Sequence, residues 1–125
     1  MDNKKIAIIG LGYVGLPLAR LFATKYPVIG FDINKARVKE LMSGHDSTLE
    51  VEDDVLRSAL VQKEKLKDKN GLYCSADLED IADCNYYIIT VPTPVDKNNR
   101  PDLTPLYKSS ETVAKVLKQG DIVIY

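Results

Sequence analysis

The sequence predicts an α/β fold in which a parallel sheet carries helices on both faces. Short apolar runs alternate with helical patterns along the chain, as they do in successive βαβ units. The first run, Ile6–Ile9, is almost uninterrupted, and a glycine-rich segment, Gly10–Gly15, follows it at once. An unbroken apolar run of this length is typical of a strand that is buried on both faces of a parallel sheet.

The first helix and the second βα unit continue this pattern. An apolar helix is expected from the glycine-rich segment to about Thr24, and Val28–Phe31 is the second strand. Asn34 is expected to cap the next helix, because its side-chain oxygen can accept hydrogen bonds from the first turn. That helix is expected to end at Gly44. Its apolar side chains share one face: Val38, Leu41 and Met42.

The middle of the chain is more polar. The spacing of its apolar residues predicts a short helix within residues 51–60, and the charged stretch Lys63–Asn70 is expected to be solvated. A short strand, Leu72–Cys74, and one or two helical turns within residues 78–82 are expected next. Tyr86–Val91 is rich in β-branched and aromatic residues, which predicts a strong fourth strand.

The last unit begins with a proline-rich loop, residues 92–102. Thr104 is expected as the N-cap of a helix with Pro105 at its first position, and this helix is expected to run to about Lys118. A fifth strand begins at residues 122–124, and the sequence ends within it. We therefore expect a fragment of a longer protein, with the sheet cut in or after its fifth strand.

Composition limits the function classes. The 125 residues are 45% hydrophobic and 28% charged, as in one globular domain, residues 1–125. Seventeen basic and 18 acidic residues give a formal net charge of −1, so neither nucleic acid nor an anionic membrane is an expected partner. The uncharged run Ile6–Ala19 is interrupted by glycines and lacks a cleavage site, which favours a cytoplasmic protein over a secreted one. Cys74 and Cys84 are expected to be reduced structural thiols.

The glycine-rich segment has the Gly-x-Gly-x-x-Gly spacing of a dinucleotide-binding turn and stands between a strand and a helix. Gly10 permits a tight turn, Gly12 permits close approach of a pyrophosphate, and Gly15 permits close packing of helix on sheet. The free N–H groups at the start of the helix would then hold the phosphates. The alternative is a glycine-rich turn without a ligand. The residues expected at the cofactor are Gly10, Leu11, Gly12, Tyr13, Val14 and Gly15.

Asp32 ends the second strand, 22 residues after Gly10, where a carboxylate would accept hydrogen bonds from ribose hydroxyls. These features together predict a Rossmann-like, doubly wound sheet. A 2′-phosphate would be repelled by Asp32, and Ile33 and Asn34 offer no cation, so NAD is favoured over NADP. Arg37 is a candidate contact for the adenosine ribose or a phosphate; the alternative is a solvated arginine on the helix surface.

The loop after the fourth strand is a second candidate for cofactor contact. In open α/β sheets the ligand lies outside the carboxyl ends of the strands, near the point where strand order reverses. Two prolines stiffen the loop around Thr93, so its hydroxyl is a candidate contact for the cofactor. The alternative is an ordinary turn threonine.

Other polar residues are interpreted as structural. His45 is expected at the surface, and Tyr86 and Tyr87 are expected as sheet residues. Asp53 and Asp54 are expected in a solvated, acidic helix start, and no spacing in the sequence matches a metal site. We find no general acid–base pair in the sequence, so no catalytic residue is assigned within this chain.

Taken together, the motifs resemble the NAD-binding domain of the UDP-glucose and GDP-mannose dehydrogenase family, over essentially the whole chain. The later motifs are similar to the branch that oxidises UDP-N-acetylhexosamines for polysaccharide synthesis, as in the Vi-antigen type enzymes. The segments that carry the resemblance are Ile8–Ala19, Gly30–Asn34, Ile88–Pro94, Pro101–Leu106 and Gly120–Val123.

This resemblance implies a two-step oxidation of a sugar C6 hydroxyl to a carboxylate with two NAD molecules. It implies NAD contacts at Val14, Asp32, Arg37 and Thr93. The family's catalytic threonine, cysteine and lysine, and its substrate domain, are expected beyond Tyr125. The parent enzyme is expected to be a homodimer that binds a UDP-sugar. Two alternatives remain at this point: an NAD-sensing module without catalysis, and the same fold with FAD or S-adenosylmethionine.

Overall fold

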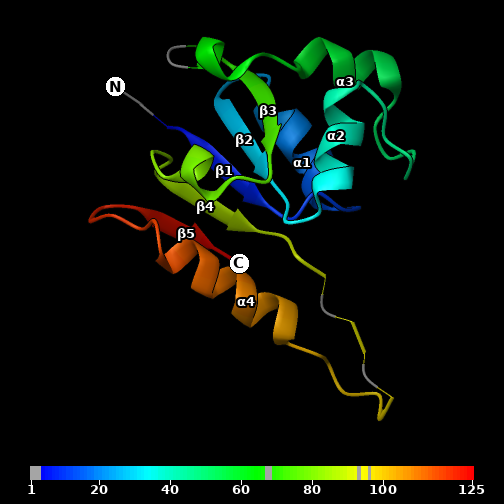
Figure 1. Cartoon of the computed structure of the whole chain (residues 1–125), viewed down its shortest axis with the longest axis vertical. Helices are drawn as coiled ribbons and strands as arrows, with labels where there is room; N and C mark the ends of the chain where they lie inside the picture. The colour runs from blue at the N-terminus through cyan, green and yellow to red at the C-terminus, as the bar shows by residue number, and fades with distance from the viewer. Residues whose placement is uncertain (1–3, 67–68, 93, 96) are drawn as a thin grey trace.

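The chain forms a five-stranded parallel sheet with the strand order β3-β2-β1-β4-β5 (Figure 1). The structure, a computed structural model, describes residues 4–66, 69–92, 94–95 and 97–125. Strand order reverses between β1 and β4, so the predicted α/β class and parallel sheet are confirmed. The strands are β1 (Ile6–Ile9), β2 (Pro27–Phe31), β3 (Gly71–Ser75), β4 (Tyr86–Ile89) and β5 (Ile122–Ile124).

Helical segments connect the strands, close to the predicted positions. No helix within the described part of the chain is long and apolar enough to cross a bilayer. Asn34 caps α2 as predicted, since its side-chain oxygen accepts from the N–H groups of Ala36 (3.1 Å) and Arg37 (3.2 Å). The segments are α1 (Gly15–Phe22), α2 (Lys35–Met42), α3 (Asp53–Ala59), the 3₁₀ turns η1 (Lys63–Leu66) and η2 (Leu78–Ile81), and α4 (Thr104–Ala114).

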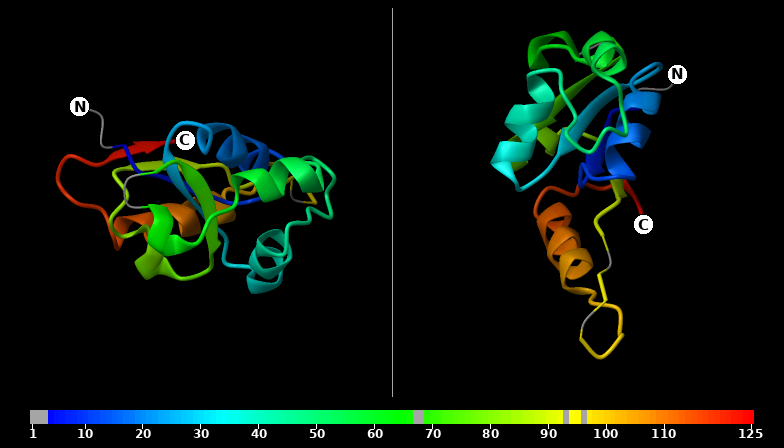
Figure 2. Two further views of the ribbon diagram at one scale, coloured as in Figure 1. Left: turned by 90° about the horizontal axis from the view of Figure 1, so that it is seen from above. Right: turned by 90° about the vertical axis from the view of Figure 1, so that its right-hand side faces the viewer.

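The sheet separates two apolar cores. One core packs α1, α2 and α3 against one face, through Leu16, Leu41 and Leu56. The other packs η1, η2 and α4 against the opposite face. Successive residues of β1 point into different cores, with Ile8 in the first and Ile9 in the second. Both faces are therefore covered, as the apolar character of β1 predicts. In the side view, α4 and the segment before it extend away from the body of the domain (Figure 2).

Two glycines fix the turn between β1 and α1. Gly10 has φ +97°, a left-handed conformation that favours glycine. A Cβ atom at Gly15 would lie 1.7 Å from the carbonyl oxygen of Gly10 and 2.4 Å from the Thr90 hydroxyl oxygen. Only a glycine at position 15 lets α1 start this close to the sheet, so the predicted roles of these two glycines are confirmed.

Some predicted boundaries are wrong. Thr104 is the first helical residue rather than the N-cap, which is Leu103; the carboxylate of Asp102 accepts from the Thr104 N–H instead (3.0 Å). The helix α4 ends at Ala114, not near Lys118, because the Lys118 N–H binds the Asp121 carboxylate in a turn (2.9 Å). The strand β4 and the helix α1 each end two residues earlier than predicted.

The prediction that Lys63–Asn70 is solvated is also wrong in part. Leu66 is buried in the second core, and Lys63 forms an ion pair with Asp80. Burial opposes ionisation of Asp80, but hydrogen bonds from Lys63 and Ser75 outweigh it and lower the pKa of this carboxyl. This charged stretch therefore contains one apolar residue that packs in the core.

Tyr87 offers a test of the second core. Its buried hydroxyl donates to the carbonyl oxygens of Ile81 (2.8 Å) and Cys84 (3.0 Å). Tyr87→Phe should lower the free energy of unfolding by about 1 kcal/mol, because the hydrogen bonds of the hydroxyl are lost while the Ile81 and Cys84 carbonyls each keep a second donor, the Cys84 N–H and Lys118 Nζ. Urea denaturation measures the change. Tyr86→Phe, on the other face of the same strand, is the matched control and should change stability less. Equal losses would contradict this account.

Candidate dinucleotide site

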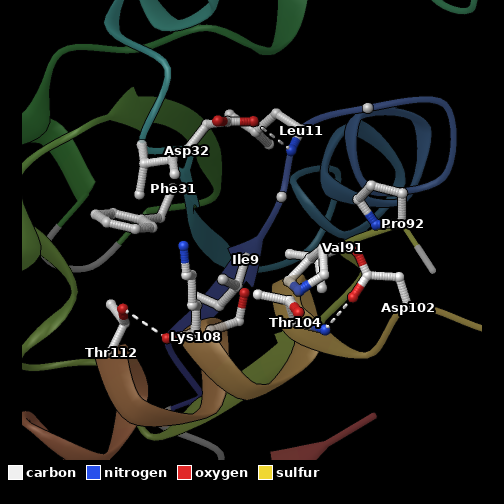
Figure 3. Close-up of a pocket in the computed structure, with 15 residues that line it drawn as sticks. Ile9, Leu11, Phe31, Asp32, Val91, Pro92, Asp102, Thr104, Lys108 and Thr112 are labelled. Carbon is white, nitrogen blue, oxygen red and sulfur yellow. Dashed lines mark hydrogen bonds between the residues drawn. The ribbon is translucent and has the colours of Figure 1, made fainter. Parts of the chain in front are cut away.

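A cleft of about 560 Å³ lies at the carboxyl ends of β1 and β2, next to the segment after β4 (Figure 3). It stands beside the point where strand order reverses, the expected place for a ligand in an open α/β sheet. Its size falls in the usual range of small-molecule pockets. The side chains and backbone that line it are Ile9, Gly10, Leu11, Gly12, Phe31, Asp32, Ile33, Val91, Pro92, Asp102, Thr104, Pro105, Lys108, Ser109 and Thr112.

The glycine-rich turn forms one edge of this cleft. Apart from its chain neighbours, no described residue has an atom within 4 Å of where a Cβ atom at Gly12 would lie, so the space above this residue is open. Tyr13 and Val14 are 68% and 64% exposed, which is unusual for large apolar side chains. Val14 is the N-cap residue of α1, and no side chain in the described part of the protein caps this helix start. Open space over a glycine beside an uncapped helix N-terminus fits a pyrophosphate group.

Asp32 lies beside Leu11 of the glycine-rich turn, at the end of β2. Its carboxylate accepts hydrogen bonds from the N–H groups of Leu11 (3.0 Å) and Asn34 (2.9 Å). These two bonds orient the carboxylate beside the glycine-rich turn while it lines the cleft. An ionised carboxylate has about four acceptor positions, so further positions remain for ribose hydroxyls.

Arg37 does not lie on the helix surface as a solvated side chain, so that alternative is wrong. The side chain is 10% exposed. Its Nε donates to the carbonyl oxygen of Leu11 (2.9 Å), and its Nη1 donates to Glu40 (3.1 Å) and Asp46 (2.8 Å). Within the described residues its Nη2 is buried and has no hydrogen-bond partner. Arg37 does not line the cleft, so its contact with a cofactor stays a prediction.

Asp46 was not identified from the sequence. Its side chain is fully buried and accepts five hydrogen bonds, from Arg37, the Thr48 N–H and hydroxyl, and the N–H groups of Glu50 and Val51. Burial opposes its ionisation, but these hydrogen bonds outweigh burial and hold the pKa of Asp46 far below its ordinary value. The Asp-x-Thr spacing, which is typical of an Asx turn, was the available signal.

The helix α4 contributes residues that the sequence analysis also missed. Thr104, Lys108 and Thr112 lie along one face of α4 and line the cleft, and the Lys108 side chain points toward Ile9 and Phe31 (Figure 3). Asp102 lies beside them, and its hydrogen bonds with Thr104 lower the pKa of its carboxyl. The spacing of four residues places these side chains on one helix face and was the signal in the sequence.

The two cysteines, His45 and the Asp53–Asp54 pair lie where they were expected. Burial raises the pKa of both the Cys74 and the Cys84 thiol to about 12, so neither is a ready nucleophile. His45 is half-exposed and lies 2.9 Å from the Asp53 carboxylate. Asp53 and Asp54 form the first turn of α3. Thr93 lies outside the described residues, so its role stays a prediction.

The buried carboxylate of Asp46 and its five hydrogen bonds predict a pH dependence of stability. A carboxyl whose pKa is lowered by folding stabilises the fold above its unfolded pKa of 3.8, and this contribution is lost as the pH falls toward the folded value. Asp46→Ala should reduce the free energy of unfolding by roughly 3 kcal/mol at pH 7, because it removes five hydrogen bonds and one of the two carboxylates that pair with the buried Arg37. The difference from the unmodified chain should narrow between pH 5 and pH 3. Urea denaturation at these pH values measures it, and Asp54→Ala, an exposed acid, is the control. A difference that does not vary with pH would contradict the assignment.

Comparison with known proteins agrees with this site. The family model for the UDP-glucose/GDP-mannose dehydrogenase family, NAD binding domain, matches residues 4–125. The chain is 51% identical over 125 residues to the UDP-N-acetyl-D-glucosamine 6-dehydrogenases of Pseudomonas aeruginosa and Salmonella typhi, covering 100% of this chain and 27% of each relative.

A solved structure, that of a UDP-D-ManNAc dehydrogenase from Pyrococcus horikoshii, superimposes with a TM-score of 0.82 at 36% identity, over 95% of this chain and 27% of that one. The chain thus spans about a quarter of the length of the relatives it matches. The match of the family model extends over nearly the whole chain. The chain therefore belongs to the UDP-glucose/GDP-mannose dehydrogenase family and represents its NAD-binding domain.

Proposed function

We propose that the cleft binds NAD and that the chain, residues 1–125, is the cofactor-binding domain of a nucleotide-sugar 6-dehydrogenase. The observation that carries the proposal is the open space over Gly12 between the N-terminus of α1 and the oriented carboxylate of Asp32. NAD accepts a hydride from the substrate in enzymes of this class.

The glycine-rich turn would hold the pyrophosphate. Backbone N–H groups of residues 12–15 would donate to the phosphate oxygens, with the exposed side chains of Tyr13 and Val14 against the cofactor. Asp32 would accept from the adenosine ribose hydroxyls, and Arg37 would stand behind it with its Nη2, which has no partner among the described residues. Thr93 would contact the cofactor from the loop after β4. The apolar part of the cleft, which includes Ile33 and Val91, would receive the adenine ring.

The reaction of the whole protein is proposed from its relatives. Several of the matched proteins are named as dehydrogenases of UDP-N-acetyl-D-glucosamine or UDP-N-acetyl-D-mannosamine. We propose that the longer enzyme oxidises the C6 hydroxyl of such a UDP-sugar to a carboxylate for polysaccharide synthesis, with two NAD molecules, and that it acts as a cytoplasmic homodimer. The buried free thiols support a reducing compartment. An NAD-sensing module without catalysis is not favoured, because the matched proteins are named as dehydrogenases.

Gly12→Val tests the pyrophosphate site. The valine side chain would fill the open space that a pyrophosphate needs, so NAD binding should become undetectable by calorimetric titration. The fold should be unchanged, because a Cβ atom there meets no protein atom within 4 Å. Circular dichroism and urea denaturation are the controls. A Gly12→Val variant that binds NAD as tightly as the unmodified chain would refute the site.

The chain is expected to bind NAD without turning over a substrate. Oxidation of an aldehyde to a carboxylate by this route needs an accessible thiolate: it adds to the aldehyde as a thiohemiacetal, loss of a hydride to NAD gives a thioester, and water releases the carboxylate. Cys74 and Cys84 are both buried, and their thiols stay protonated at neutral pH. The chain should therefore give a flat NADH absorbance trace with NAD and a panel of UDP-sugars. Sustained NADH production that is lost on Cys74→Ala or Cys84→Ala would place catalysis within the chain.

A further inference from the structure

Two charged side chains bind the backbone of Leu11 in the glycine-rich turn, and two more bind one of these. Asp32 accepts from the Leu11 N–H, and Arg37 donates to the Leu11 carbonyl oxygen. Asp46 and Glu40 both accept from Nη1 of the same Arg37. One guanidinium and three carboxylates leave a formal charge of −2 beside the position proposed for the adenosine ribose.

The two carboxylates behind Arg37 are held in their ionised forms. Asp46 is fully buried and keeps five hydrogen bonds, and its pKa is far below the ordinary value. The backbone N–H of Ser47 donates to Glu40, and this hydrogen bond is the main cause that lowers the pKa of Glu40. Because Arg37 and Asp46 are shielded from water, these charges act on one another with little screening. The positive charge of Arg37 is thus offset within the fold.

One nitrogen of the guanidinium is nevertheless unpaired among the described residues. This nitrogen, Nη2, is buried, on a side chain that also binds the glycine-rich turn. Rossmann domains that bind a 2′-phosphorylated dinucleotide use a nearby arginine to bind this phosphate. A guanidinium whose charge is already offset by two carboxylates suits a neutral hydroxyl better than a phosphate that carries about two negative charges.

We propose that Glu40 and Asp46 help to determine cofactor specificity. By pairing with Arg37 they offset the charge that would otherwise attract a 2′-phosphate, and together with Asp32 they exclude NADP. This proposal rests on the proposed function, since it concerns which dinucleotide the cleft accepts. It differs from a purely structural role of the cluster, which would weaken the binding of both dinucleotides equally.

The ratio of two dissociation constants tests this proposal. NADH and NADPH are titrated against the full chain by calorimetry, with the weaker ligand measured by displacement of the other. Glu40→Gln keeps an acceptor oxygen for the Ser47 N–H but removes one negative charge. We expect it to lower the ratio of the NADPH to the NADH dissociation constant roughly tenfold, the order expected for one unit charge near a phosphate at partial screening.

Two further variants complete the experiment. Asp46→Asn should lower the same ratio, although its loop loses hydrogen bonds, because the ratio cancels a general loss of affinity. Glu79→Gln removes the same charge from an exposed side chain in η2 and should leave the ratio unchanged. A ratio that stays constant in Glu40→Gln and Asp46→Asn, while both ligands bind more weakly, would overturn the proposal. Absence of NADH binding in the unmodified chain would instead overturn the proposed function itself.

Discussion

The close contact between Gly15 and the carbonyl of Gly10 is the constraint on which the rest of this structure depends. It sets the distance between α1 and the carboxyl ends of β1 and β4, and Thr90 shares the same contact through its hydroxyl, which donates to Gly10 (2.8 Å). A side chain at position 15 would push α1 outward. The N-terminus of α1 would then no longer lie at the edge of the cleft. The position proposed for the phosphates therefore follows mainly from backbone packing.

Much of the fold could be predicted from the sequence because its signals are local. The unbroken apolar run of β1, the side-chain cap of α2 by Asn34 and the glycine spacing each depend on neighbours in the sequence. The right-handed βαβ connection then limits the order of the strands. Local signals failed at Thr104, because a hydroxyl before a proline predicts a cap, whereas the carboxylate of Asp102 supplies the side-chain oxygen at this helix start.

The candidate site could be predicted only in part. Asp32 and the glycine-rich turn were found because a fixed spacing along the chain reflects their shared position in space. The pairing of Arg37 with Asp46 crosses a loop whose course no periodicity indicates, and the Arg37 bond to Leu11 joins residues 26 positions apart. Likewise, the Lys108 side chain reaches the cleft only because α4 packs on the second core. Contacts made by tertiary packing leave no regular pattern in a single sequence.

The division of the interior into two cores has a consequence for how the domain can vary. The first core holds α1 and α2, and with them the glycine-rich turn and Arg37 with its carboxylate partners Glu40 and Asp46. The second core holds α4, of which Val113 alone among its described residues is fully buried. Side chains on opposite sides of a sheet share few contacts, so changes on the two sides combine additively in free energy. One wall of the cleft can therefore diverge in shape and charge while the wall proposed to hold the phosphates keeps its geometry.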